Sequence, residues 1–184
     1  MMIIVPLGAF CTRECASAHG LAKARRKANA QAVSNAKAIR AKHRNDKERV
    51  KKRSEWFDNL QTLVNQYVLH VRDKGKPCCT CGKQRSSGVK FDAGHYRSRG
   101  ACSELRFELT NIHAQCSVSC NQHGSGMRSE YRDFIASKYG ADHLEWLDGH
   151  HPSLKEQFPH YTDIKNEIAR YRKLLRAEGL KPNY

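Results

Sequence analysis

Two pairs of cysteines constrain this chain more than any other feature of its sequence. Cys78 and Cys81 are separated by two residues, and Cys116 and Cys120 are separated by three. Two close pairs a few tens of residues apart are typical of a short, loop-rich segment folded around one tetrahedral Zn²⁺. Gly82 follows the first pair and suits the tight turn of a zinc knuckle. The spacing therefore predicts one structural zinc held by these four cysteines, because the segment they bracket has too little apolar content to fold unaided.

The other four cysteines are assigned no ligand role. Cys79 lies between two predicted ligands, too close for favourable geometry in the same site. Cys11 and Cys15 form half of a second site with nothing to complete it, and Cys102 stands alone. No export signal is apparent and the cytosol keeps thiols reduced, so disulfides are not expected. The longest apolar run is far shorter than the roughly 20 residues of a membrane span. We therefore expect a cytoplasmic protein without a membrane partner.

A basic segment at 21–53 carries most of the charge. The chain has a formal net charge of +15, and this segment contributes +11, from 13 Lys and Arg residues against Asp46 and Glu48. Its composition favours a helix, but it has too few large apolar residues for a core-facing stripe. We expect a solvated basic helix that contacts DNA or RNA, because charge at this density repels itself unless a polyanion neutralises it. A solvated arm without specific function is the alternative. Residues 1–20 are expected to form a partial cysteine element.

Three further helices are predicted from apolar residues that recur at three- and four-residue steps. The first follows Ser54 as its N-cap and is ended by Gly75. The others span residues 129–139 and 162–178. The apolar positions of the first helix are assigned to the core and given no chemistry: Trp56, Phe57, Leu60, Leu63, Val64, Tyr67, Val68 and Val71.

The remaining pattern predicts an α+β fold. One short strand is expected at 89–93, before Gly94, inside the loop-rich segment that holds the cysteine pairs. We expect a zinc-stabilised core at 54–140 and a C-terminal helical extension at 141–184.

The segment between and just after the cysteine pairs carries polar residues that a structural zinc does not need. They are Asp92, His95, Asn111, His113, Asn121 and His123. The runs PheAspAlaGlyHisTyrArg (91–97), AsnIleHisAlaGlnCys (111–116) and CysAsnGlnHisGlySerGly (120–126) resemble the NinG recombination proteins of lambdoid phages, also called Rap. The same runs resemble HNH nucleases, whose motif is a His, a later Asn, and a Cys pair followed at once by His or Asn.

This resemblance implies a structure-specific endonuclease that cuts branched recombination intermediates such as Holliday junctions and D-loops. It also implies a small ββα-metal (HNH-like) core flanked by helices. His95 matches the first position of the motif, Asn111 the middle Asn, and Asn121 the last position. Two departures are visible: Gly94 stands where Asp often precedes the His, and an extra residue in the second cysteine pair shifts Asn121 by one. His123 is therefore the alternative for the last position.

Phosphodiester hydrolysis needs an activated water and stabilisation of negative charge on the phosphate and the leaving oxygen. His95 is the candidate general base, because imidazole titrates near pH 7. Asn121 or His123, with Asp92, is predicted to hold Mg²⁺ or Mn²⁺, which needs only one or two protein ligands. A turn or capping role is the alternative for Asp92. Asn111 is expected to brace the loop that carries His95 rather than contact substrate.

The predicted phosphate contacts are Arg97, Arg99, Arg106 and Arg128. Tyr96 is expected either to stack on an unpaired base or to pack in the core. No base-reading helix of a known type is apparent, so recognition of branch shape in branched or duplex DNA is expected. Paired cutting would suit a homodimer, with host or phage recombination proteins as further partners. The rival interpretation is a non-catalytic zinc-stabilised DNA- or RNA-binding protein, which would tolerate the loss of His95.

Overall fold

The structure, a computed structural model, describes residues 3–5, 8–10, 12–85 and 88–184. The chain divides into two compact units, Met1–Lys51 and Lys52–Tyr184. The four segments suggested by the sequence, 1–20, 21–53, 54–140 and 141–184, stay a prediction. Cys11, one member of the incomplete cysteine pair, lies outside the described residues.

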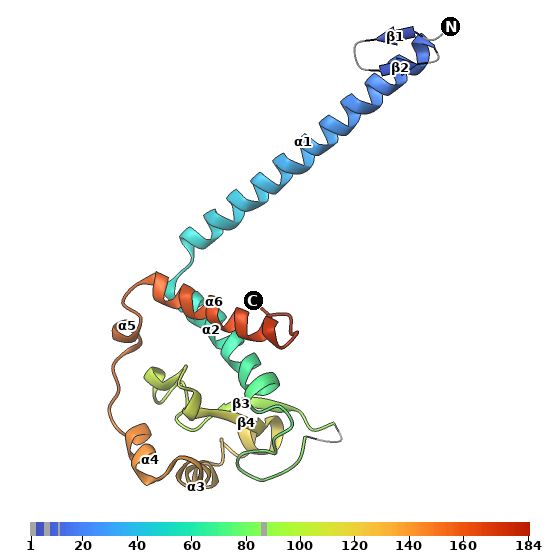
Figure 1. The fold of residues 1–184 in the computed structure, drawn as a ribbon. Coiled ribbons are helices and arrows are strands. Elements are labelled where there is room, and N and C mark those ends of the chain that lie inside the picture. The colour runs from blue at the N-terminus through green and yellow to red at the C-terminus, as the bar shows by residue number, and fades with distance from the viewer. Residues whose placement is uncertain (1–2, 6–7, 11, 86–87) are drawn as a thin grey trace. The chain divides into compact units, whose positions relative to one another are not determined.

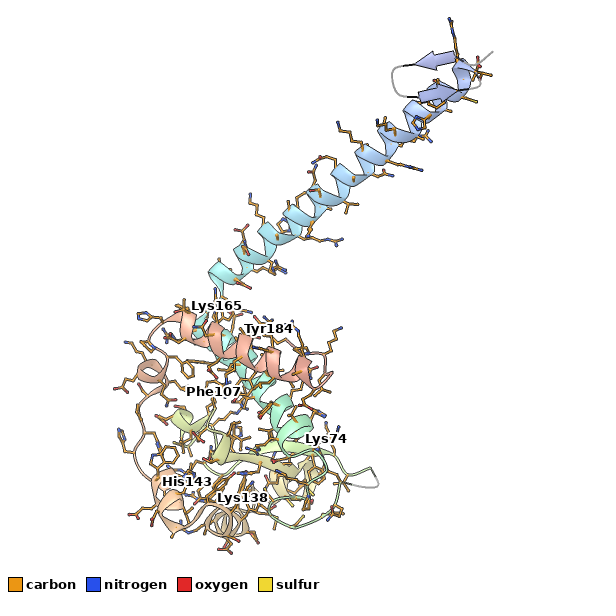
Figure 2. The ribbon with its side chains drawn as sticks, in the orientation of Figure 1. Lys74, Phe107, Lys138, His143, Lys165 and Tyr184 are labelled. Atoms are coloured by element: carbon orange, nitrogen blue, oxygen red, sulfur yellow. The ribbon has the colours of Figure 1, made fainter. Side chains whose placement is uncertain are left out.

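The first unit consists of a short antiparallel strand pair and one long helix. Strands β1 (Ile3–Val5) and β2 (Gly8–Phe10) precede α1, which spans Arg13–Val50. The helix begins eight residues before the predicted basic segment, because the Thr12 hydroxyl caps it by accepting a hydrogen bond from the backbone N–H of Cys15. Its apolar side chains face solvent, with Val33 69% exposed. Figure 2 shows the side chains of α1 standing outwards around the helix. The helix thus lacks a core-facing stripe, as its composition predicted.

The core of the second unit is built on two long helices. Helix α2 (Arg53–Tyr67) continues into a π-helix, η1 (Val68–Arg72), and packs along α6 (Tyr161–Ala177) (Figure 1). The N-cap of α2 is Lys52 rather than the predicted Ser54, and the Lys52 N–H donates to the Glu55 carboxylate at 2.7 Å. The predicted core positions of α2 pack against one face of α6. The residues of α2, η1 and α6 that are buried in this core are Trp56, Phe57, Leu60, Leu63, Val64, Val68, Ile164, Ile168, Tyr171 and Leu175.

A two-stranded antiparallel sheet crosses the middle of the second unit. It is formed by β3 (Phe91–His95) and β4 (Ile112–Cys116), with Phe91 opposite Cys116 and His95 opposite Ile112. The strand predicted at 89–93 corresponds to β3, which begins and ends two residues later, and β4 was not predicted. Gly94 lies within β3 instead of ending it. A Cβ atom there would lie 2.3 Å from Oε1 of the buried Gln115, so the close approach of this side chain requires glycine.

Helices α3 (Arg128–Tyr139) and α4 (Ala141–Asp148) lie on the other side of this sheet from α2 and α6 (Figure 1). Gly140 joins them with a φ of 92°. Short helical turns complete the unit: η2 (Ser103–Leu105), η3 (Leu109–Asn111), the π-helix η4 (Ser117–Gln122) and α5 (Leu154–Gln157). Two strands followed by a helix form the order β3, β4, α3, and the fold class is α+β as predicted. An HNH fold stays a prediction.

A buried ion pair ties β4 to the end of η1. Asp73 is 2% exposed, accepts a hydrogen bond from the backbone N–H of Ala114 at 3.2 Å, and pairs with Arg72 and Lys76. Burial alone would raise the pKa of Asp73, but the hydrogen bonds and charges of these two cations lower it to about 2. The guanidinium of Arg72 also donates to the carbonyls of Leu109 and Ile112. The same groups therefore fix the start of β4.

No helix among the described residues has both the length and the apolar character needed to cross a membrane.

Candidate functional site

The four predicted cysteine ligands meet at one point. The sulfur atoms of Cys78, Cys81, Cys116 and Cys120 all lie within 4.8 Å of one another. The sulfurs of Cys78 and Cys120 are 3.9 Å apart, and those of Cys81 and Cys116 are 3.8 Å apart. Four sulfurs about 2.3 Å from one tetrahedral Zn²⁺ would be separated by about 3.8 Å. The cluster could therefore hold a metal ion such as zinc.

Local backbone geometry brings the two pairs together. Gly82 adopts a φ of 70° and its N–H donates to the carbonyl of Cys78 at 3.0 Å, which forms the predicted knuckle turn. Cys116 is the last residue of β4, and Cys120 lies in the π-helix that follows it. The N–H of Cys79 donates to the carbonyl of Ala114 at 3.0 Å and docks the knuckle on the edge of β4. Three cysteines of the cluster are buried and Cys81 is exposed.

The electrostatics of the cluster separate Cys78 from its neighbours. A hydrogen bond from the Cys79 thiol, helped by the Thr80 hydroxyl and by backbone N–H groups, lowers the pKa of Cys78 to about 3 in spite of burial. Burial and the neighbouring sulfurs raise the pKa of Cys116 to about 12. Cys79 is outside the cluster, as predicted, and acts as a hydrogen-bond donor to one of its members.

A second feature, a polar cleft of about 230 Å³, lies where β3 ends. Its lining includes four residues predicted for the site, His95, Arg97, Asn121 and Arg128. Ser125 and Gly126 line it as well, in a loop where three consecutive residues, 125–127, have positive φ. Positive φ at two non-glycine residues is a strained conformation of the kind that clusters at ligand sites. The structure thus brings the sequence-predicted candidates from three separate segments into one cleft.

His95 has one ring nitrogen committed to the protein. Its Nε2 lies 3.1 Å from the carbonyl oxygen of Arg106. Because a carbonyl only accepts, Nε2 carries the hydrogen and Nδ1 is the basic nitrogen of the neutral ring. Burial, together with the positive charges of Arg99 and Arg106, lowers the pKa of His95 to about 4. The imidazole is therefore neutral at pH 7, and its lowered pKa makes it a weaker proton acceptor than a free imidazole.

Asn111 is fully buried below the cleft and is tied to the chain that follows His95. Its Oδ1 accepts from the backbone N–H of Arg97 at 2.8 Å, and its Nδ2 donates to the carbonyls of Arg97 and Leu105, each at 3.1 Å. The carbonyl of Asn111 also accepts from the N–H of Tyr96. These are hydrogen bonds of the bracing kind expected from the sequence; its part in catalysis stays a prediction.

The predicted ligands of a catalytic cation are only partly brought together. Asn121 donates from Nδ2 to Asp92 Oδ2 at 3.1 Å, and Ser117 donates to the same oxygen at 2.6 Å. His123 is exposed at the end of η4 and is not part of the cleft lining. Of the two alternatives from the sequence, Asn121 rather than His123 therefore shares the cleft with His95. Among the described residues, the four cysteines are the one group of three or more His, Cys, Asp or Glu side chains close enough to share a metal.

The predicted arginines divide into two groups. Arg97 and Arg128 line the cleft, and Arg99 is exposed next to it. Arg106 instead points its guanidinium at α2, where it donates to Gln61 at 3.0 Å and to Asp58 at 2.6 Å. Only its carbonyl takes part in the site, through His95.

Comparison with known proteins gives the chain a family. The family model described as "Bacteriophage Lambda NinG protein" matches residues 4–178. The chain belongs to the NinG family. The Protein ninG of Escherichia phage lambda is 37% identical over 127 residues, which cover 69% of this chain and 60% of that protein. The Protein ninG of Salmonella phage P22 is 36% identical over 127 residues, covering 69% and 61%. That of Escherichia phage 933W is 39% identical over 102 residues, covering 55% and 49%.

The chain spans about half to three fifths of the length of these NinG relatives. No solved structure matches it. The resemblance to NinG proteins is thereby confirmed, and the HNH motif stays a prediction. The cysteine cluster and the cleft both lie within the residues that match the NinG family.

Sequence reasoning missed several residues that shape the cleft of this NinG-family chain. Gln115 donates to the carbonyl of Gly126 at 2.7 Å and supports the strained loop. Asp148 of α4 accepts hydrogen bonds from Tyr96 and Arg132. Tyr96 itself is 6% exposed, so it packs in the core rather than presenting its ring for base stacking. No spacing in the sequence links Gln115 or Asp148 to His95, because their partners lie on other elements.

Proposed function

We propose that this chain is a metal-dependent, structure-specific DNA endonuclease that acts on branched recombination intermediates such as Holliday junctions and D-loops. The observation that carries the proposal is the cleft in which a neutral His95 lies beside Arg97, Arg128 and Asn121. A base, two phosphate-binding cations and a polar ligand are the side chains that phosphodiester hydrolysis calls for. NinG family membership supports phage recombination as the setting.

In the proposed reaction, His95 accepts a proton at Nδ1 from the attacking water. The water oxygen bonds to phosphorus, the bond from phosphorus to the 3′ oxygen breaks, and that oxygen leaves with the bonding electron pair and takes a proton from a solvent water. Arg97 and Arg128 bind the non-bridging oxygens, where negative charge increases. The carboxylate of Asp92 and the amide oxygen of Asn121 are oxygen donors suited to Mg²⁺ or Mn²⁺, which would supply Lewis-acid stabilisation of the leaving oxygen.

The cysteine cluster is proposed to hold one structural zinc. Two sulfur separations, 3.8 and 3.9 Å, support this, since they are close to the roughly 3.8 Å expected in a tetrahedral four-thiolate site. All four tetrahedral positions would be filled by protein, so this ion has no open position for substrate.

The test is cleavage of a synthetic four-way junction and a matched linear duplex with Mg²⁺ or Mn²⁺. His95→Ala is expected to lower the cutting rate at least about 100-fold, the usual contribution of a general base, and to leave junction affinity unchanged. His123→Ala, which changes an exposed histidine outside the cleft, is the matched control and should cut normally. Equal cutting by wild type and His95→Ala would remove His95 as the base. No cutting by wild type, with tight binding, would favour the second candidate function.

That second candidate is a zinc-stabilised nucleic-acid-binding protein in which α1 supplies the affinity. It is favoured by a shallow groove on one side of α1, lined by Val33, Ala36 and Ala41 and rimmed by Lys37, Arg40 and Arg44. Small side chains beside three cations leave room for a phosphate backbone to approach. In the nuclease proposal the same surface tethers the duplex.

Replacing Lys37, Arg40 and Arg44 with Gln tests the contribution of α1. If each cation neutralises one phosphate, the slope of log affinity against log salt should fall by about 2.7. The control removes the same charge from exposed lysines of the second unit, Lys155, Lys173 and Lys181. Equal slopes for the two triple variants would exclude a dedicated role for α1.

A further inference from the structure

We propose that Asp148, at the end of α4, is a positioning residue that holds Arg97 and Tyr96 in the orientation required by the cleft. The inference rests on the proposed function, in that Arg97 is taken to bind a DNA phosphate. Neither the cysteine pairs nor the His and Asn motif includes Asp148.

Three side chains converge on the carboxylate of Asp148. The hydroxyl of Tyr96 donates to Oδ1 at 3.0 Å, and its distance to Oδ2 is 3.2 Å. A terminal nitrogen of Arg132 donates to Oδ2 at 2.6 Å. The Nη1 nitrogen of Arg97 lies 3.7 Å from Oδ1 and donates to the carbonyl of Leu147 at 3.1 Å. The last turn of α4 thus receives both side chains that follow His95 in sequence.

Arg97 is consequently fixed at both ends. Its backbone N–H and carbonyl are bonded to Asn111, and one corner of its guanidinium is held by Leu147 and Asp148. An arginine side chain otherwise has considerable rotamer freedom, which costs binding free energy when a ligand immobilises it. With Nη1 committed to α4, the remaining N–H groups of Arg97 are available to the cleft in a pre-organised position.

Asp148 restrains Tyr96, the residue next to the candidate base, in the same way. Its ring is buried and packs edge-on against Tyr131 at a centroid distance of 5.7 Å. Its hydroxyl therefore has Asp148 as the partner that satisfies it inside the core. The chain from His95 to Arg97 is bound to the end of η3 through Asn111 and to α4 through Asp148.

The test is a double-mutant cycle on junction affinity, with Asp148→Asn and Arg97→Gln. Asparagine keeps the size and the acceptor for Tyr96 but loses the charge that holds Arg97. Each single variant is expected to weaken binding about tenfold, the scale of one hydrogen bond to a charged group. The double variant should be no weaker than Arg97→Gln alone, because both changes remove one interaction. Cutting rates, where measurable, should follow the same pattern.

The sign of the Asp148→Asn effect separates positioning from simple electrostatics. Removing a negative charge next to a DNA site would by itself strengthen binding, whereas loss of positioning weakens it. Arg132→Gln is the control, because Arg132 pairs with the same carboxylate but its side chain is 56% exposed and does not line the cleft. It should bind within about twofold of wild type, as expected for an exposed ion pair.

Tyr96→Phe removes only the hydroxyl and serves as the second variant if Asp148→Asn lowers thermal stability. Its binding should be weaker than wild type but stronger than that of Asp148→Asn. Tighter binding by Asp148→Asn, or additive effects in the cycle, would overturn the proposal. If the wild type binds junctions without ever cutting them, and the variants bind as the cycle predicts, the positioning role stands and only the nuclease proposal fails. A wild type that does not bind junctions would overturn both.

Discussion

The two ends of the β3–β4 hairpin are built in different ways. At one end, Cys116 lies opposite Phe91 and contributes to a cluster of four sulfurs that comes from two short sequence pairs. At the other end, His95 lies opposite Ile112 and donates one hydrogen bond to the carbonyl of Arg106, with Asn111 and Asp148 fixing the residues that follow it. Five residues of strand separate a centre suited to metal from one held only by polar contacts.

The difference teaches where stability and function reside in this unit. A four-thiolate centre is all-or-none, because three sulfurs bind zinc far less well than four. At the cleft end, stability should be lost in small steps, because each hydrogen bond contributes on the order of 1 kcal/mol and its loss leaves the others in place. Substitutions at the cysteine end should therefore unfold the unit, and those at the cleft end should first change geometry.

The largest effect is expected from the cysteine end. Cys116→Ser should lower the free energy of unfolding by roughly 5 kcal/mol or more, because metal-binding energy in such a centre is folding energy. Chemical denaturation and elemental analysis of the purified protein measure it, and wild type should carry one zinc per chain. Cys15→Ser changes an exposed cysteine of α1 in the other unit and should leave the second unit unaltered. Unchanged stability of Cys116→Ser would remove the distinction between the two ends.

Asn111→Ala should have the largest effect at the cleft end. The side chain is fully buried and makes three hydrogen bonds to backbone groups, so its loss is expected to cost about 3 kcal/mol. Urea unfolding measures this cost. Asn121→Ala, at a partly exposed position in the same cleft, should cost less than about 1 kcal/mol. A similar loss for both variants would show that the cleft end does not depend on Asn111.

Asp73 connects the hairpin to η1 and should give a pH-dependent effect of intermediate size. Its pKa in the folded protein, about 2, lies below the ordinary value of 3.8 for an aspartate. The stabilisation is therefore present above about pH 4 and is lost as the pH falls from 4 through 2. Asp73→Asn should be less stable than wild type by about 2 kcal/mol at pH 7, and the two should converge near pH 2. Equal differences at pH 7 and pH 2.5 would contradict the ion pair as the source.

The smallest effect is expected from Gly94→Ala. The added methyl group must displace the buried Gln115 side chain, at a cost of about 1–2 kcal/mol. Thermal unfolding measures it, with Gly100→Ala as the control, because a Cβ at Gly100 meets nothing within 4 Å. In a Gln115→Ala background, the cost of Gly94→Ala should be smaller, because the side-chain oxygen 2.3 Å from the added methyl group is gone and the Cβ of residue 115, at 3.1 Å, remains. An undiminished cost there would mean that another contact excludes the methyl group.

The sequence predicted the features that depend on local spacing. The cysteine pairs are the clearest example, because the four positions that come together in one cluster follow from two- and three-residue gaps and a glycine turn. The amphipathic period likewise predicted α2 and α6, whose apolar positions pack as expected. Local signals also carried the resemblance to the NinG family.

The features that depend on distant partners were not predictable in the same way. Strand β4 is buried at all five positions, and it includes His113 and Gln115. His113 is satisfied by the hydroxyls of Tyr131 and Tyr139, at 3.2 and 2.9 Å. Without those partners in view, the run does not alternate and gives no strand pattern. Gly94 was interpreted as a strand end for the same reason, since its partner is Gln115 of the neighbouring strand. The role of Asp148 is invisible until α4 is folded.

The solvent exposure of α1 has a consequence for how the chain melts. A helix of 38 residues, none of whose described side chains belongs to a buried apolar cluster, is stabilised by its own backbone hydrogen bonds and propensities. Its unfolding should therefore be gradual and non-cooperative, fraying from the ends as temperature rises, whereas the second unit should melt in one sharp transition. A circular dichroism melt of the whole chain would show a sloping loss of helix signal before that transition. A polyanion bound along α1 would neutralise its charge and make this loss of helix signal less steep. Circular dichroism melts with and without a polyanion therefore report whether α1 binds one.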